Sequence, residues 1–331
     1  MAPSATVDFI VAPQAKTTGD VEVDALASMA HRGKSLPGIP SFASHSQTRQ
    51  WQLEHMAGAF RVFAREGYAE GISGHISVRD PEFPDRFWIN PLGVHFGLLR
   101  ASDMICVNAD GDVVAGNTSG SINAAGFQIH SAVHRARPDV HAICHTHSLH
   151  GRAWSAFARP LEMINQDVCY FYKAHSVYSD YGGIANEASE GEKIAQSLGE
   201  NGKAAILMNH GLLTVGQTVD EAAFLFCLME RSCKVQLLAD AAGHEKRLVK
   251  DEEAAYNFRM GSTPVRGSRC IEVGVTGTNM IYRRRCMWSS NRTTSMRRHC
   301  QMGASSIKFQ ARNTRSMVVA LAKLDPNTHI E

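Results

Sequence analysis

The chain has 331 residues, of which 44% are apolar, and a formal net charge of +2, so it can bury one large core or two modest ones. It contains no apolar run of about 18 residues and no charged-then-apolar N-terminal signal, so nothing in the sequence indicates membrane insertion or secretion, and we expect a cytoplasmic protein. Its eight cysteines form no C-x-x-C pair, which favours reduced, buried thiols over a disulfide framework.

The N-terminal third begins with a segment of weak periodicity. Residues 1–44 are rich in Ala, Pro, Ser and Gly, which predicts a flexible leader. Residues 47–66 then carry apolar side chains at helical spacing and predict an amphipathic helix. Short strands follow at 74–79 and 87–90, and a hairpin is predicted from 104–108 and 113–114.

The middle of the chain alternates helices and strands. Residues 124–136 predict a helix that ends before Pro138, and the apolar run to His147 predicts the next strand. A helix at 190–198, a buried strand at 204–209 and a helix from Thr218 to Leu238, opened by a capping box, complete the pattern. No linker interrupts these elements, so we expect a single α/β domain at 45–258.

The C-terminal segment 259–331 differs in composition. It holds 13 Lys/Arg against 3 Asp/Glu, so the rest of the chain is acidic. A basic arm of this kind could bind nucleic acid, but it has no helical stripe and no regularly interleaved aromatic residues. We therefore predict a disordered or aberrant tail, such as a shifted reading frame would encode, and no nucleic-acid partner.

Two histidines one residue apart, His145 and His147, lie at the end of a predicted strand. Residues i and i+2 of a strand lie on one face, so both rings can converge on one point. A second predicted strand also ends in a histidine, His210. Three neutral imidazoles would hold Zn²⁺, with Fe²⁺ as the alternative, and leave coordination positions open. The competing interpretation is that these polar residues simply face water, while Cys144 points to the opposite face as a core thiol.

Several segments carry a family resemblance, and their order and spacing fit over about 210 residues. They are residues 74–79 (GHISVR), 90–93 (NPLG), His130 with 136–139 (ARPD), the His145/His147 pair and 209–216 (NHGLLTVG). Together they resemble the class II aldolase/adducin superfamily.

The resemblance implies a three-layer α/β/α fold with a central, mainly antiparallel sheet. It also implies a homotetramer that acts on a small molecule between subunits. His145, His147 and His210 match the histidines that bind the metal, which polarises a substrate carbonyl as a Lewis acid. Residues matching the substrate pocket are Gly74, His75, Asn90 and Gly93.

The sequence departs from the aldolase pattern at three positions. Gly126 stands where the aldolases carry an acid/base glutamate, His75 replaces a phosphate-binding asparagine, and Leu92 replaces a serine. A phosphorylated sugar is therefore a poor substrate candidate. The same changes resemble members from secondary metabolism, which include non-haem iron oxygenases.

These departures leave three functions open. The first is a metal-dependent lyase that performs aldol-type cleavage or decarboxylation of a non-phosphorylated carbonyl compound or 2-oxo acid. The second is a non-haem iron oxygenase on the same scaffold, and the third is a non-catalytic, adducin-like interaction module. Replacement acid/base groups for an enzyme could come from Glu162, Asp167, Tyr172 and His175, although packing or surface roles would explain the same residues.

Overall fold

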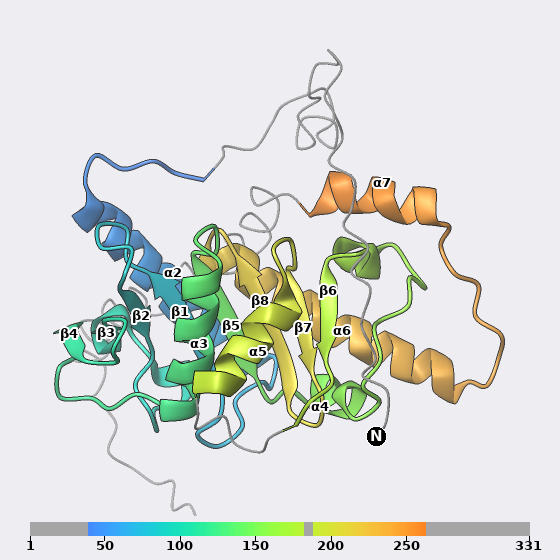
Figure 1. The fold of residues 1–331 in the computed structure, drawn as a ribbon, viewed down its shortest axis with the longest axis horizontal. Coiled ribbons are helices and arrows are strands. Elements are labelled where there is room, and N and C mark those ends of the chain that lie inside the picture. The colour runs from blue at the N-terminus through green and yellow to red at the C-terminus, as the bar shows by residue number, and fades with distance from the viewer. Residues whose placement is uncertain (1–38, 182–187, 263–331) are drawn as a thin grey trace, which may run out of the picture. The chain divides into compact units, whose positions relative to one another are not determined.

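A single eight-stranded sheet forms the centre of the structure (Figure 1). The strands are β1 (His75–Arg79), β2 (Phe87–Ile89), β3 (Ile105–Val107), β4 (Val113–Gly116), β5 (Ala142–Thr146), β6 (His175–Tyr178), β7 (Ala204–Leu207) and β8 (Gly211–Gly216). Their order is β4-β3-β2-β1-β5-β8-β7-β6, and every neighbouring pair is antiparallel except β6 and β7. The predicted α/β fold with a mainly antiparallel sheet is confirmed.

The structure is a computed structural model that describes residues 39–181 and 188–262, all within one compact unit. Most of the predicted leader and of the predicted tail lies outside the described residues. The α-helices are α2 (His45–Arg65), α3 (Ala124–Ala136), α4 (Leu149–Ser155), α5 (Ala188–Leu198), α6 (Val219–Ala241) and α7 (Asp251–Gly261), and the 3-10 helices are η2 (Phe96–Leu98), η3 (Ala101–Asp103) and η4 (Asp167–Phe171). Helix α7 extends three residues past the predicted domain end at 258.

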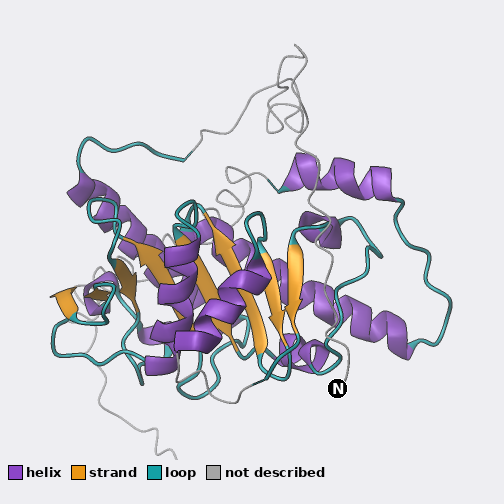
Figure 2. Cartoon of the chain, in the orientation of Figure 1, coloured by secondary structure: helices purple, strands orange, loops and turns teal. Residues whose placement is uncertain are grey.

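Helices cover both faces of the sheet (Figure 2). Helices α3 and α5 share one apolar cluster with the sheet, which includes Ile129, Ile194 and Ile143. Helices α2, α4 and α6 pack on the other face, in a larger cluster that includes Cys144. Neighbouring residues of β5 thus enter opposite layers, as strand alternation requires. The three-layer arrangement is confirmed, and His145 falls on the side of α3 and α5.

The thiol of Cys144 is fully buried in the layer formed by α2 and α6. Burial raises the pKa of the Cys144 thiol well above its ordinary value, because the thiolate would lose its hydration. Cys144 is therefore the core thiol that strand alternation predicts.

Most predicted elements are present, with ends shifted by a few residues. Strands β6 and β8 and helices α4 and α7 were not predicted. Strand β8 is buried along its whole length, so it shows none of the polar alternation that marks a half-buried strand. It lies between β5 and β7 in the sheet.

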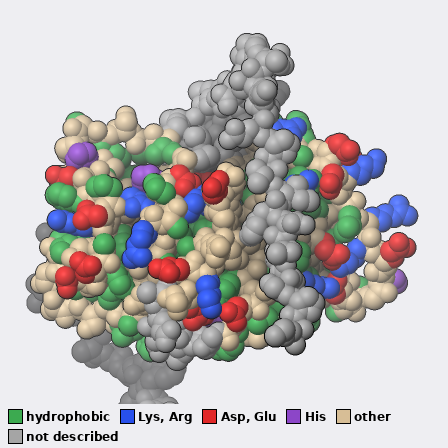
Figure 3. Space-filling view, viewed as in Figure 1, with side chains coloured by type: hydrophobic (Ala, Val, Ile, Leu, Met, Phe, Trp, Pro, Cys, Tyr) green, Lys and Arg blue, Asp and Glu red, His purple; other side chains and the backbone are tan. Residues whose placement is uncertain are grey.

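The surface of the described residues mixes both signs of charge. On the face that Figure 3 shows, basic and acidic side chains alternate with apolar ones, as in a surface exposed to water. Among the described residues no helix has the length and apolar character needed to cross a membrane.

One buried carboxylate, that of Glu230 on α6, fixes the segment that follows β5. Its oxygens accept hydrogen bonds from the backbone N–H of His150 at 2.9 Å, the N–H of Gly151 at 2.6 Å and the Ser148 hydroxyl. These donors include free N–H groups of the first turn of α4, which a carboxylate satisfies well. The contact holds α4, and with it the residues next to His147, against α6.

Removing this carboxylate should destabilise the protein strongly. We expect Glu230→Ala to lower the free energy of unfolding by about 3 kcal/mol, because several buried donors lose their acceptor. The control is Glu66→Ala, which removes a more exposed ion pair with Arg231 and should cost less than about 1 kcal/mol. Urea unfolding followed by tryptophan fluorescence measures both, and equal small losses would contradict a structural role for Glu230.

Candidate metal centre

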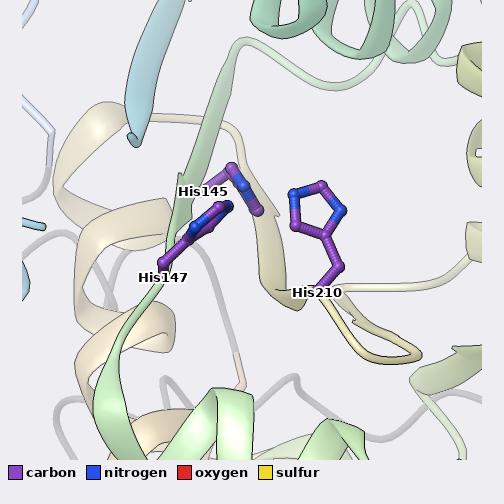
Figure 4. Close-up of side chains that lie close together, drawn as sticks. All are labelled: His145, His147 and His210. Atoms are coloured by element: carbon purple, nitrogen blue, oxygen red, sulfur yellow. The ribbon is translucent and has the colours of Figure 1, made fainter. Parts of the chain in front are cut away.

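Three histidine rings converge beside the end of β5 (Figure 4). His145 lies on β5, His147 follows it, and His210 comes from the turn between β7 and β8. Ring centroids are 4.8 Å apart for His145 and His210 and 4.9 Å apart for His147 and His210. One nitrogen from each ring lies within 4.8 Å of the others, so the three rings form a candidate ligand set for one ion.

Local backbone geometry explains the Asn-His-Gly sequence at 209–211. Asn209 has a φ of 56°, a left-handed conformation that asparagine tolerates better than most residues. A Cβ at Gly211 would lie 2.9 Å from the carbonyl oxygen of Thr146, so only glycine lets β8 begin this close to β5. Together they place His210 opposite the end of β5.

All three imidazoles are uncharged at neutral pH. Burial, reinforced by the neighbouring His210, lowers the pKa of His145 well below its ordinary value. Burial and His147 lower the pKa of His210 to about 4, and burial and the positive charge of Arg152 lower the pKa of His147. Neutral rings offer the lone pairs that a divalent ion requires.

The ring of His145 is fixed in the orientation and tautomer that a metal ligand needs. Its Nδ1 donates a hydrogen bond of 2.8 Å to the carbonyl oxygen of Leu212 on β8. A carbonyl only accepts, so the proton is on Nδ1 and the lone pair is on Nε2. The donor chemistry of the triad therefore fits a divalent transition ion such as Zn²⁺ or Fe²⁺.

A row of buried polar side chains lies between β1 and α3, next to the triad. The His75 ring stacks on His145 with centroids 5.2 Å apart, and its Nδ1 shares a hydrogen bond of 3.2 Å with His130 Nε2. The Ser77 hydroxyl lies 2.7 Å from His130 Nδ1 and 2.8 Å from His134 Nε2. These four residues, His75, His130, Ser77 and His134, are called the polar row below.

Two of the other three predicted pocket residues, Gly74 and Asn90, lie in close contact with neighbouring elements. Gly74 has a φ of 96°, and a Cβ there would lie 2.9 Å from the Phe96 ring and 3.2 Å from the carbonyl oxygen of His145. The Asn90 side chain accepts a hydrogen bond from the backbone N–H of Ile76. Gly93 has a φ of 80° and no atom near its Cβ position. Their contact with a substrate stays a prediction.

His175, one of the predicted acid/base residues, is hydrogen-bonded through both ring nitrogens. Its Nδ1 donates to the carbonyl oxygen of Phe171 at 2.8 Å, and its Nε2 accepts from the N–H of Leu161 at 3.0 Å. Both bonds are to the main chain, so a catalytic role for His175 stays a prediction without support from these contacts.

The other three predicted acid/base residues also lack a described contact with the triad. Glu162 forms an ion pair with Lys246, Asp167 is an exposed residue at the start of η4, and the Tyr172 ring lies beneath the ammonium of Lys173. A catalytic role for Glu162, Asp167 or Tyr172 stays a prediction without support from these contacts.

Sequence reasoning missed two members of the polar row. Ser77 follows His75 by two positions on a strand, and His134 follows His130 by four positions on a helix, so each pair shares a face. The i, i+2 spacing on a strand and the i, i+4 spacing on a helix could have identified Ser77 and His134 from the sequence. An ion pair between Arg152 and Glu70, 3.6 Å apart, was also missed; it lies close enough to His147 to influence its pKa.

Comparisons with known proteins identify the family of the chain. The family model described as "Class II Aldolase and Adducin N-terminal domain" matches residues 54–237. The chain is 45% identical to a 4-hydroxy-3-prenylphenylpyruvate oxygenase/4-hydroxy-3-prenylbenzoate synthase of Streptomyces roseochromogenus subsp. oscitans, over 67% of this chain and 80% of the relative. It is 41% identical to the decarboxylase NovR of Streptomyces niveus, over 67% of this chain and 82% of the relative.

A solved structure is similar over a comparable span. It is the L-fuculose 1-phosphate aldolase from Glaciozyma antarctica PI12, with 40% identity and a TM-score of 0.67. The similarity covers 73% of this chain and 94% of that chain.

The polar row predicts a loss of stability in acid. Burial lowers the pKa of His134 from 6.5 to about 3, so in acid the unfolded chain binds a proton that the folded chain does not. Stability therefore falls as the pH drops from 6.5 towards 3, by about 2 kcal/mol for this ring at pH 5. When the pH is lowered from 7 to 5, we expect the free energy of unfolding of His134→Leu to fall by about 2 kcal/mol less than that of the wild type. Urea unfolding at both pH values tests this, and equal losses would contradict it.

Proposed function

The chain belongs to the class II aldolase and adducin family, and on that premise we propose that it is a metal-dependent lyase. Its proposed substrate is a non-phosphorylated carbonyl compound or 2-oxo acid, and its reaction is aldol-type cleavage or decarboxylation. The observation that carries the proposal is the convergence of three uncharged histidines, with one nitrogen of each within 4.8 Å of the others.

The residues of the chain have distinct roles in this proposal. His145, His147 and His210 would hold the ion, and the Leu212 carbonyl keeps His145 in the tautomer that can bind it. A divalent ion held there would act as a Lewis acid that polarises a substrate carbonyl. This would assist aldol-type cleavage of the bond between the α and β carbons of that substrate. No carboxylate belongs to this group among the described residues, so the ligands leave the ion's positive charge uncompensated, which suits an anionic substrate.

The absence of phosphate from the proposed substrate rests on the pocket residues. Leu92, which is 40% exposed, has no hydrogen-bonding side chain at the position where the resemblance places a serine. One ring nitrogen of His75 is already hydrogen-bonded to His130. The name of the Glaciozyma antarctica protein, in contrast, gives a phosphorylated sugar as the substrate of that protein. L-Fuculose 1-phosphate must therefore be tested beside the 2-oxo acids.

A non-haem iron oxygenase is the second candidate, and the name of the Streptomyces roseochromogenus relative favours it. Direct loss of carbon dioxide from a 2-oxo acid leaves the bonding electrons on the carbonyl carbon, so a Lewis acid at the oxygen assists this reaction less than it assists aldol-type cleavage. Dioxygen can accept those electrons, and three histidine ligands leave room for it beside a 2-oxo acid.

The family resemblance supports a proposal about the assembly. We propose a homotetramer with a small-molecule substrate and a site near the subunit boundary, and the cytoplasm stays the predicted location. Size-exclusion chromatography with light scattering measures the assembly state.

Purified protein should contain about one divalent ion per chain when zinc and iron are both supplied during growth. His147→Ala and His210→Ala should each lose most of that ion, since two remaining imidazoles bind much more weakly. The matched control is His244→Ala, an exposed histidine outside the triad, which should keep the ion. Elemental analysis measures the content. Metal-free wild-type protein that also fails to bind added zinc or iron would overturn the proposal and favour the interaction module.

Dioxygen dependence separates the lyase from the oxygenase. A lyase should release its product from phenylpyruvate or an aldol substrate at the same rate under nitrogen and in air, because it uses no oxidant. An oxygenase should consume dioxygen as it releases carbon dioxide, and should stop under nitrogen. Turnover of L-fuculose 1-phosphate would contradict a substrate without phosphate.

A further inference from the structure

The ring of His75 occupies the space that a side chain at position 126 would need. Gly126 lies in the first turn of α3. A Cβ built on it would lie 2.6 Å from Cδ2 and 2.6 Å from Nε2 of His75, closer than carbon and nitrogen atoms can approach. His75, on β1, and Gly126 therefore form one steric unit: with the ring in this position, residue 126 cannot carry any side chain.

His75 has one nitrogen committed and one available. Its Nδ1 is bonded to His130, and its ring face lies on His145. Its Nε2 has no hydrogen-bond partner among the described residues and lies next to the Cβ position of Gly126. This nitrogen is on the opposite side of the ring from the bond to His130, and the ring itself stacks on His145 of the triad.

The polar row lets Nε2 carry a proton without any charge on the ring. His134 Nε2–H can donate to the Ser77 oxygen, the Ser77 hydroxyl to His130 Nδ1, and His130 Nε2–H to His75 Nδ1. In this arrangement every ring is neutral and His75 presents an N–H group to the site. The reverse set of donors is also neutral but leaves a lone pair on Nε2, so a bound carboxylate selects the first arrangement. The hydrogen bond to the polar row also fixes the plane of the His75 ring, which limits the side-chain entropy lost when a substrate binds.

We propose that His75 takes the place of the missing α3 carboxylate and binds the substrate: its Nε2 hydrogen-bonds a carboxylate oxygen of a 2-oxo acid held at the triad. This inference rests on the proposed function. A glutamate at position 126 would repel a carboxylate placed next to the ion, whereas a neutral imidazole N–H can donate to it. The His75/Gly126 pair thus selects for substrates whose carbonyl carries a neighbouring carboxylate.

The test is the affinity of metal-loaded protein for oxalate, an unreactive analogue of the carboxyl–carbonyl pair, measured by calorimetry. His75→Phe keeps a flat ring but loses the nitrogen, and should weaken oxalate binding by about tenfold, the loss typical of one shielded hydrogen bond. Gly126→Ala keeps the nitrogen but displaces the ring, and should cause a similar loss. The double variant should lose no more than His75→Phe alone, because both changes remove the same contact.

Controls separate this proposal from the proposed function. Each variant must retain one ion per chain by elemental analysis and a cooperative thermal transition, and Gln128→Ala on the same helix should bind oxalate as the wild type does. If His75→Phe fails to fold, Gly126→Ala and His75→Asn carry the test.

The outcomes are distinct. Wild-type protein that binds no metal would overturn the proposed function. Metal-loaded protein that binds oxalate equally well with and without the His75 imidazole would overturn the role of His75 alone. Additive losses in the double variant would overturn the steric unit, and loaded wild-type protein that binds no oxalate would overturn the carboxylate assignment.

Discussion

The antiparallel pairing of β5 with β8 is the constraint on which the candidate site depends. It brings Thr146 opposite Leu212, so that the end of one strand meets the beginning of the other. His145 and His147 arrive from the first strand and His210 from the turn before the second. The same pairing places the Leu212 carbonyl within reach of His145. Backbone hydrogen bonding of the sheet thus sets both the positions and one tautomer of the triad.

The side chains between β1 and α3 are polar, whereas the other side chains that pack beneath α3 and α5 on that face of the sheet are mainly apolar. Burial of an unpaired imidazole is costly, and His75, His130 and His134 avoid part of that cost by bonding to one another through Ser77. All three rings have lowered pKa values, so the row remains uncharged. It supports the triad without adding charge beside the ion, which leaves the ion as the main positive charge of the proposed site.

The fold is that of the family, and one steric pair distinguishes the proposed site. The sheet is similar to those of solved family structures, while positions 75 and 126 carry a histidine and a glycine that depend on each other. Chemistry on such a scaffold can change through two positions without any change in strand order, because a ring from β1 and a side chain from α3 compete for one volume.

The sequence by itself determined the fold class, most elements and the three histidines that converge beside β5, because strand ends, caps and the H-x-H spacing are local patterns. Helix 124–136 was predicted with the bounds of α3. Only the tertiary structure decided that β8 separates β5 from β7, that His175 is used by the main chain, and that His75 lies in the space of a residue-126 side chain. The physical reason is that these facts depend on contacts between residues far apart in the chain: fully buried strands lose their alternation, and a ring's partners and the space around it are set by the neighbouring elements.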